Sequence, residues 1–264
     1  MGEARVTAIL VTYNSNHCLT RALGSLPAGV PSIVVDNGSV DASAATAELH
    51  AGQVLRLNQN FGFSKACNAG AAVANTEFLL MMNPDSEVEG DAISALIAAA
   101  ERYPDAAAFN PRFVGPASPP PARSAPADDR RVETLSGAAL LVRKKLFDEV
   151  GGFDEHFFLY FEDTDLSKRL ATKGLLMQIG GACFVHGVGQ SSRLTLRDEF
   201  RKYRHYGRSR VYYSIKHEQR FNRVRQAIAQ ALKAIHRLAI GRTRLAAQHL
   251  GRAVGYAQGP RSTS

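Results

Sequence analysis

The sequence has few cysteines and no long apolar run, and each absence excludes a class of protein. Its three cysteines, Cys18, Cys67 and Cys183, stand far apart and are odd in number, which argues against a disulfide framework and a zinc knuckle. No run of eighteen apolar residues is present, and residues 1–10 do not read as a secretory leader. We therefore expect a chain that stays in the cytoplasm, with its cysteines buried as small hydrophobic residues.

Phosphate-binding glycine motifs and a calcium loop are also missing. No Gly-x-Gly-x-x-Gly follows the first apolar run, and Gly187-Val188-Gly189 comes far too late and lacks the third glycine. No Walker lysine loop is present. The segment 36–41 begins like a calcium loop, but Asp41 occupies its glycine position and Ala47 its final glutamate position. These absences exclude a dinucleotide fingerprint, a P-loop and an EF-hand.

Charge divides the chain into two parts that differ in sign. The chain has 264 residues and a formal net charge of +8. Residues 1–192 hold 15 Lys and Arg against 21 Asp and Glu, a net −6, whereas residues 193–264 hold 17 against 3, a net +14. We predict an acidic domain over 1–192 and a basic helical extension over 193–264, so the overall basic charge describes only the extension.

The apolar pattern predicts an α/β fold with a mostly parallel, twisted sheet flanked by helices. Apolar runs predict strands over 6–11, 33–35, 54–57, 78–82, 135–142, 175–179 and 183–186. Helical spacing predicts helices over 19–26, after an Asp91 cap, and over about 162–172. Five prolines between Pro116 and Pro126 favour a mobile loop over 115–131. After residue 192 we expect helices.

Polar residues directly follow four of these strands, where ligands of a parallel sheet bind. They are Thr12-Tyr13-Asn14, Asp36-Asn37-Gly38-Ser39, Asn83-Pro84-Asp85 and His186-Gly187. Tyr13 offers a ring face to a base, and Asp36 offers an acceptor to a base N–H or a ribose hydroxyl. Each segment alone is equally typical of an ordinary turn. Together they favour a binding site.

Asp85 and His186 are candidates for a sparse metal site. Pro84 fixes the backbone beside Asp85. Mg²⁺ usually takes one or two protein carboxylates and completes its shell with substrate phosphates and water, and an imidazole also suits Mn²⁺. A hydrogen-bonded core histidine is the alternative interpretation of His186.

An acidic cluster over 162–165 begins the helix expected there. At 100° per residue, Asp163 falls beside Leu166 and Leu170, so we expect it to point inward. Asp165 and Arg169 fall on the other side, where we expect an exposed i, i+4 pair. The helix dipole favours the charged form of an inward carboxylate in the first turn, as a general base requires, although helix capping explains it nearly as well.

Six segments and one histidine, taken together and in order, resemble glycosyltransferase family 2, and within it the bacterial rhamnosyltransferases. They are Val11–Asn14, Val35–Asp41, Asn60–Gly70, Asn83–Asp85, Gly151–Glu155 and Phe161–Leu166, followed by His186. The resemblance spans about residues 5–190. It implies a GT-A fold, a UDP-, dTDP- or GDP-sugar donor, Mg²⁺ or Mn²⁺, and inversion at the anomeric carbon.

The resemblance also assigns roles to individual residues. Tyr13 and Asp36 match nucleoside contacts, Asp85 and His186 match metal ligands, and Asp163 matches the catalytic base. The wider set of expected donor contacts adds Thr12, Asn14, Asn60, Lys65, Asn68 and Asn83, and the expected acceptor contacts are Gly137 and Glu162. Asn83 stands where the family often has the first metal-motif aspartate, so we expect weaker metal affinity in the absence of donor.

The implied reaction moves a sugar, rhamnose by resemblance, to a saccharide or lipid-linked saccharide acceptor in cell-surface polysaccharide or glycolipid assembly. Asp163 would take the proton of the acceptor hydroxyl, which attacks from the face opposite the nucleotide. The metal would neutralise the departing diphosphate. A sugar-nucleotide binding protein without catalysis remains an alternative, although Asp163 and Asp85 argue against it.

The extension contains a basic amphipathic helix. Val224, Ile228, Ala231, Ile235 and Leu238 form an apolar stripe, with arginines and a lysine off it. One interpretation is attachment to the anionic inner face of the cell membrane; the other is packing on the chain's own acidic domain or on a second subunit. The tail also interleaves aromatic residues with arginines, as a single-stranded nucleic-acid surface can. No RNA-binding motif accompanies it, so nucleic acid is the least favoured partner.

Overall fold

The computed structural model describes residues 4–116, 129–187 and 195–260. Contacts between Cα atoms divide the chain into two units. The first contains Met1–Phe61, Lys65–Phe153 and Leu166–Arg193, and the second contains Gly62–Ser64, Asp154–Asp165 and Leu194–Ser264. The expected boundary at 192/193 and residues 117–128 of the expected loop lie outside the described residues, so both stay predictions.

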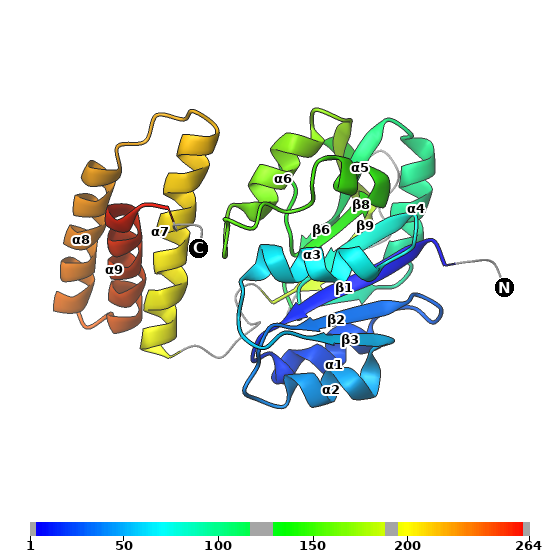
Figure 1. The fold of residues 1–264 in the computed structure, drawn as a ribbon, viewed down its shortest axis with the longest axis horizontal. Coiled ribbons are helices and arrows are strands. Elements are labelled where there is room, and N and C mark those ends of the chain that lie inside the picture. The colour runs from blue at the N-terminus through cyan, green and yellow to red at the C-terminus, as the bar shows by residue number, and fades with distance from the viewer. Residues whose placement is uncertain (1–3, 117–128, 188–194, 261–264) are drawn as a thin grey trace. The chain divides into compact units, whose positions relative to one another are not determined.

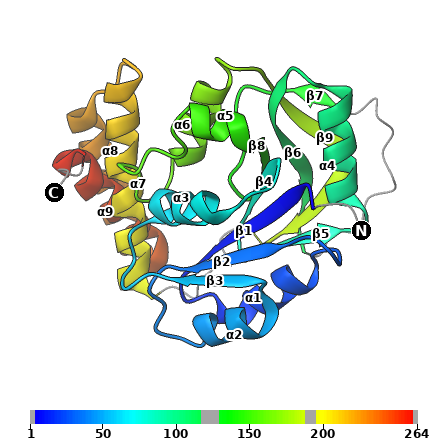
Figure 2. The same cartoon turned by 45° about the vertical axis from the view of Figure 1, so that its right-hand side comes forward.

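The first unit is built on one sheet, which is seen in Figure 1 and whose nine described strands are labelled in Figure 2. Eight of them follow the order β3-β2-β1-β4-β8-β6-β9-β5, and β7 pairs with β9. Strands β1, β2, β3, β4, β6 and β9 run one way, and β5, β7 and β8 run the other. The bounds are β1 Val6–Thr12, β2 Ser32–Asp36, β3 Gln53–Arg56, β4 Phe78–Met82, β5 Ser86–Glu89, β6 Ala106–Val114, β7 Arg130–Arg131, β8 Ala139–Arg143 and β9 Leu175–His186.

Helices cover both faces of the sheet, which explains why its central strands are continuously apolar. Figure 2 shows α1 and α2 on one side of β1–β3 and α3 on the other. Ala8, Leu10 and Val34 pack with α1, whereas the α3 residue Gly70 lies against Ile9. The helices of this unit are α1 Asn16–Gly24, α2 Ser43–His50, α3 Phe63–Val73, α4 Ala92–Arg102 and α5 Lys144–Glu149, and α6 Glu162–Leu170 begins in the second unit and continues into the first.

The expected α/β fold is confirmed, with four differences in detail. The two short strands expected between 175 and 186 are one continuous strand, β9. The sequence patterns missed β5 and β6; β6 is alanine-rich and contains Pro111, which lowers its strand propensity, and the ladder shifts register after Pro111. Arg130 and Arg131, expected in the loop, form β7. Asp91 stands at the start of α4, but its side chain does not cap the helix.

The second unit contains the expected basic helices, which are α7 Leu196–Lys216, α8 Arg223–Ala239 and α9 Thr243–Gln258. A capping box of Thr195 and Asp198 starts α7. Helix α9 packs against both α7 and α8. A Cβ at Gly207 would lie 2.7 Å from the Arg252 carbonyl oxygen, so glycine is required for the close approach of α7 and α9.

Within the described residues, no helix is long and apolar enough to cross a membrane. The three cysteines are buried and free, as expected.

Candidate active site

The loops after β1 and β2 are joined by hydrogen bonds that hold the predicted nucleoside contacts together. The Asn14 amide donates to Ser39 Oγ (3.0 Å), and the Val40 amide donates to Asn14 Oδ1 (2.8 Å). Asn14 adopts φ of +54°, a left-handed conformation that asparagine tolerates. The Tyr13 side chain beside it is 36% exposed, so its ring can receive a base. Thr12 is fully buried, and its Oγ1 has no hydrogen-bond partner.

Asp36 and Asn37 extend this network to the loop after β3. Asp36 is buried and accepts from the Ser39 amide (3.2 Å). The Asn37 side chain donates to Asn60 Oδ1 (3.1 Å) and accepts from the Phe61 amide (2.9 Å). Asn37 was not among the predicted site residues, although it lies within the Asp36–Ser39 segment that was predicted to contribute to the binding site.

Gly38 makes the approach of these two loops possible. Its φ is +77°, and a Cβ there would lie 2.7 Å from backbone atoms of Gln59. Both observations require glycine. The sequence Asp-Asn-Gly-Ser therefore sets the geometry of the loop that carries Asp36.

Two predicted donor contacts lie on or near α3. The Lys65 ammonium lies 4.7 Å from the centre of the Phe61 ring. The Asn68 side chain donates to the Phe153 carbonyl (2.8 Å) and accepts from the Phe153 amide (2.9 Å). Asn68 therefore holds the Gly-Gly-Phe loop on α3, and its contact with a donor stays a prediction.

The predicted metal ligands meet where β5 pairs with β9. Ser86 is in register with His186, so the preceding residue, Asp85, comes to His186; Asp85 Oδ1 lies 3.5 Å from His186 Nε2. The side chains are 3% and 16% exposed. A carboxylate oxygen beside an imidazole nitrogen fits Mg²⁺ or Mn²⁺ whose remaining ligands come from phosphate and water. No group of three or more His, Cys, Asp or Glu side chains that could hold a metal ion occurs among the described residues.

Asn83 and Gly137 lie in two turns that are joined to each other. The Asn83 carbonyl accepts from the Ser86 amide (3.1 Å), which closes a turn with Pro84 and Asp85 at its centre. The Asn83 amide donates to the Ala138 carbonyl (3.0 Å), next to Gly137. Buried Asn110, which sequence reasoning missed because β6 was missed, donates to the Ser136 carbonyl (3.0 Å) and so holds the Gly137 turn.

The second unit carries the predicted catalytic base at the start of α6, after two residues in an unfavourable conformation. Tyr160 and Phe161 both have φ of +69°, which is unusual for aromatic residues. Aromatic side chains of α7 hold them: Tyr206 packs on both rings, with centroids 5.3 and 5.2 Å away, and Tyr213 packs on Phe161. The α7 aromatics are thus engaged within the protein, which removes the main sequence argument for a nucleic-acid surface.

Glu162 and Asp163 are neighbours with different environments. Asp163 is half-buried, and its Oδ1 accepts from the Thr164 amide (2.7 Å). Glu162 is buried, and its Oε2 has no hydrogen-bond partner. Burial, reinforced by the charge of Asp163, raises the pKa of Glu162 to about 8. Glu162 is therefore a neutral acid at pH 7, able to donate a hydrogen bond.

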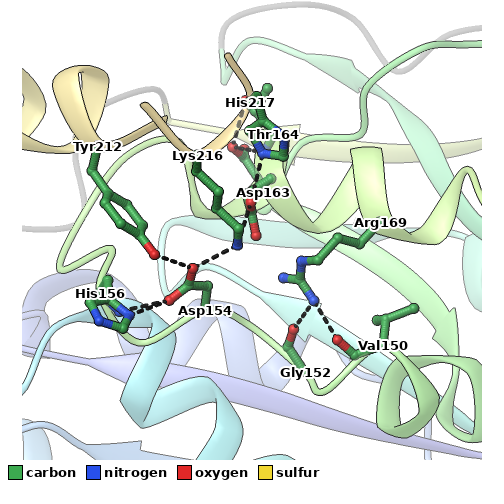
Figure 3. Close-up of polar contacts among 11 residues, drawn as sticks. Val150, Gly152, Asp154, His156, Asp163, Thr164, Arg169, Tyr212, Lys216 and His217 are labelled. Atoms are coloured by element: carbon green, nitrogen blue, oxygen red, sulfur yellow. Dashed lines mark hydrogen bonds and ion pairs between the residues drawn. The ribbon is translucent and has the colours of Figure 1, made fainter. Parts of the chain in front are cut away.

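The expected orientation of Asp165 is wrong. Asp165 is fully buried, not exposed, and its Oδ1 receives Lys216 Nζ (2.7 Å) and His217 Nε2 (2.8 Å). Arg169 does not form the expected surface pair and instead donates to the Val150 and Gly152 carbonyls (Figure 3). The apolar residues of α6 predict burial only on the Leu166 side of the helix. The C-terminal end of α7, which cannot be predicted from the α6 sequence, covers Asp165 on the other side.

Lys216 joins two carboxylates, the partly buried Asp154, which is labelled in Figure 3, and the buried Asp165. Its ammonium lies 2.6 Å from Asp154 Oδ2 and 2.7 Å from Asp165 Oδ1. Asp154 also accepts from Tyr212 Oη (2.9 Å) and the His156 amide (3.0 Å). Burial acts to raise the pKa of Asp154, but hydrogen bonds from Lys216, His156 and Tyr212 outweigh it and lower the pKa well below its usual range.

The structure brings the predicted residues together in two groups. In the first unit, hydrogen bonds connect the Asn14, Asp36 and Asn60 loops, and Asp85 meets His186. In the second, Glu162 and Asp163 stand beside the Asp165–Lys216 pair. Lys216 and His217 were missed because they belong to the predicted extension, and no pattern within that segment links them to the distant acidic residues Asp154 and Asp165.

Comparison with known proteins gives three findings. Residues 7–164 match the family described as Glycosyl transferase family 2. An N-acetylglucosaminyl-diphospho-decaprenol L-rhamnosyltransferase of Mycobacterium tuberculosis is 30% identical, with 64% of this chain and 71% of that protein covered.

Solved structures share the fold at low identity. S. aureus TarS 1–349 in complex with UDP has a TM-score of 0.57 and 18% identity over 78% of this chain. The mannosyltransferase PcManGT of Pyrobaculum calidifontis, in complex with GDP-Man and Mn²⁺, has a TM-score of 0.61 and 17% identity over 82% of this chain. The chain spans about 65% of each of these structures' own length.

Replacing Lys216 by methionine should destabilise the protein by about 3 kcal/mol, because removal of one partner leaves buried charges uncompensated. The matched control is Lys144→Met. Lys144 and Lys216 are similarly exposed, at 23% and 25%, and Lys144 pairs with Asp148 at 2.7 Å, but Asp148 is 53% exposed. The control should cost less than about 1 kcal/mol. Urea unfolding followed by circular dichroism measures both, and equal losses would contradict the bridging role of Lys216.

Replacing Glu162 by glutamine should change how stability depends on pH. Since folding raises the pKa of Glu162 from 4.5 to about 8, wild-type stability should fall as pH rises through this range. Glutamine has no proton to lose, so the melting temperature of Glu162→Gln minus that of the wild type should grow from pH 5 to pH 8 and then level off. Thermal unfolding at pH 5, 7 and 9 tests this, with the exposed Glu155→Gln as control. A constant difference would show that Glu162 is charged in the folded protein.

Proposed function

The chain belongs to glycosyltransferase family 2, and from that membership we propose that it transfers a sugar from a nucleoside diphosphate to a hydroxyl of a saccharide, with inversion at the anomeric carbon. The observation that carries the proposal is the meeting of Asp85 and His186 at 3.5 Å. A carboxylate and an imidazole at the strand ends fit a cation shared with a diphosphate. Tyr13 and Asp36, in the loops after β1 and β2, supply a ring face and an acceptor for a nucleoside.

Asp163 acts as the general base in this proposal. It accepts the proton of the acceptor hydroxyl as that oxygen bonds to the anomeric carbon, while the bond from this carbon to the diphosphate breaks. Asp154 and Asp165 are committed to Lys216, and Glu162 keeps its proton at pH 7. Asp163 is half-buried, so an acceptor hydroxyl can reach it, and it is the residue that matches the family's catalytic base.

Asp85 and His186 would hold the divalent cation, Mg²⁺ or Mn²⁺, whose charge would offset that of the departing diphosphate. The Mn²⁺ present with GDP-Man in PcManGT supports this assignment. Asn83 adds only a neutral group, so the donor diphosphate has to supply much of the charge that binds the ion. We therefore propose that metal and donor bind together.

The substrate class follows from the M. tuberculosis relative, whose name specifies transfer of L-rhamnose to N-acetylglucosaminyl-diphospho-decaprenol. We propose a deoxysugar nucleotide, rhamnose in the first instance, as donor and a lipid-linked saccharide as acceptor, in the assembly of a cell-wall polysaccharide. Such an acceptor would place the enzyme at the inner face of the cell membrane. Buried Glu162, as a hydrogen-bond donor, and the Gly137 turn are the proposed acceptor contacts.

Replacing Asp163 by asparagine should lower transfer by about a thousandfold, since a general base contributes roughly that much. Donor binding should not change. Release of nucleoside diphosphate in the presence of acceptor measures transfer, and calorimetry measures donor binding. Asp148→Asn on α5 is the control, since Asp148 is exposed. Wild-type transfer by Asp163→Asn would exclude Asp163 as the base.

Replacing Asp85 by asparagine should weaken Mn²⁺-dependent binding of nucleoside diphosphate about tenfold or more, because Asp85 is the only carboxylate of the proposed pair. In EDTA the variant and the wild type should bind alike. A thermal-shift screen of UDP-, dTDP- and GDP-sugars with Mn²⁺ identifies the nucleotide to use, since ligands that bind the folded state raise its melting temperature. The control is Asp105→Asn, an exposed carboxylate. Unchanged Mn²⁺ dependence in Asp85→Asn would contradict the metal assignment.

A further inference from the structure

Helix α8 exposes a row of large aliphatic side chains. The row consists of Val224, Ile228, Leu232, Ile235 and Leu238, each between 58% and 65% exposed. Their spacing of three or four residues places them along one side of the helix. Scattered exposed aliphatic residues are common on proteins, but a continuous row is typical of an interaction surface.

The row is not the side on which α8 packs. Ala234 is buried, and Gln230 Oε1 accepts a hydrogen bond from His249 Nδ1 of α9 (2.7 Å). These two residues lie on a side of α8 that is rotated by about 100° from the row. Small and polar side chains thus make the contact between α8 and α9, and the large aliphatic groups are left beside it. The amphipathic pattern of α8 therefore does not serve the packing of its own helical unit.

The surroundings of the row are cationic. Arg223, Arg225 and Lys233 are exposed on the same helix, and His236 and Arg237 are close by in sequence. From Phe221 to the end of the chain the sequence contains no aspartate or glutamate. An aliphatic row that is accompanied by cations and lacks carboxylates is complementary to an anionic lipid bilayer, in which negatively charged headgroups cover the hydrocarbon chains.

A hollow in the same unit is also suited to a lipid. It has a volume of about 290 Å³ and lies between the end of α7 and the start of α8. Val211, Ile215 and Phe221 line it together with Arg223, which directly precedes the first residue of the row. Ser214 and Gln219 complete the lining, and a hollow with apolar side chains beside a guanidinium is suited to part of an acyl chain and its phosphate.

We propose that the α8 row docks on an anionic phospholipid bilayer and so brings the enzyme to a lipid-linked acceptor. This inference rests on the proposed function only for the purpose that it assigns to docking. Binding of α8 to the bilayer itself requires neither sugar donor nor acceptor. The aliphatic row enters the boundary between headgroups and acyl chains, and Arg223 and Arg225 at its N-terminal end contact lipid phosphates. Lys233 lies on the other side of the helix and adds to the attraction of the anionic surface.

The charges argue against a second copy of the chain and against nucleic acid as the occupant. A two-fold dimer through the row would place the cations of one α8 beside the same cations of the other, with no carboxylate on α8 or α9 to pair with them. A single-stranded nucleic acid needs aromatic faces for its bases. The row has none, and Tyr206 and Tyr213 of α7 pack inside the unit.

Co-sedimentation of the full chain with vesicles tests the proposal. Phosphatidylcholine vesicles that contain phosphatidylglycerol should bind the protein, and vesicles of phosphatidylcholine alone should bind it at least about tenfold more weakly. Ile228→Asn/Ile235→Asn should lose about tenfold in binding to the anionic vesicles. The matched control is Leu49→Asn, which removes an aliphatic side chain that is 80% exposed on α2, and its binding should not change. Arg225→Gln/Lys233→Gln should weaken binding and its salt dependence, whereas the exposed Lys145→Gln on α5 should not.

Release of nucleoside diphosphate with a water-soluble acceptor separates this inference from the proposed function. The Ile228→Asn/Ile235→Asn variant should keep wild-type activity on the soluble acceptor and lose activity on an acceptor embedded in anionic vesicles. Wild-type vesicle binding by this variant would overturn the inference and leave the proposed function intact. So would a dimer, detected by sedimentation, that this variant abolishes, or salt-dependent RNA binding in a protein that does not bind vesicles.

Discussion

The second unit depends on one charge, the ammonium of Lys216. It lies between two carboxylates, the partly buried Asp154 of the Gly-Gly-Phe-Asp loop and the buried Asp165 of α6, at 2.6 and 2.7 Å. Burial of either carboxylate without a cation would be costly, so the ends of the segment 154–165 and the C-terminal end of α7 have to fold together. Tyr160 and Phe161 lie between those ends in their left-handed conformation, and the α7 aromatics hold them there. The position of Asp163 is thus determined by the packing of a helix that follows it by more than thirty residues.

This dependence explains what could and could not be predicted from the sequence. The apolar runs located β1, β2 and β4 to within one or two residues, because strands buried on both faces leave a continuous signal. The polar residues after these strands and after the strand that ends near His186 predicted one site from Asn14, Asp36, Asp85 and His186, and Asn14 is joined to the loop after β2 while Asp85 meets His186. Asn60, which joins the same loop, was predicted from the family resemblance alone. Asp165 was misplaced because periodicity within one helix cannot identify a neighbour from a distant segment. Strand β6, and with it Asn110, was missed because alanine and proline give no strand signal.

The cations that give residues 193–264 a net charge of +14 are of two kinds. Some are internal connectors: Lys216 holds buried carboxylates, Arg208 donates to the Gly259 and Pro260 carbonyls, and Arg252 lies 4.4 Å from the centre of the Tyr203 ring. Others, such as Arg223, Arg225 and Lys233, are exposed on α8. The charge of Lys216 is offset by two carboxylates that lie outside residues 193–264, so the field available for docking is weaker than the net charge of this segment indicates.

Glu162 and Asp163 show how neighbouring carboxyl groups acquire different roles. They are adjacent in the chain at the same helix start, so the helix dipole acts on both. Burial separates them, because Glu162 is desolvated and retains its proton to about pH 8, whereas Asp163 keeps contact with solvent and accepts a hydrogen bond from the Thr164 amide. A neutral acid can donate a hydrogen bond to an acceptor oxygen while the carboxylate beside it accepts the proton of the attacking hydroxyl. The charge on Asp163 also helps to keep Glu162 neutral, so the carboxylate of the pair favours the protonated form of its neighbour.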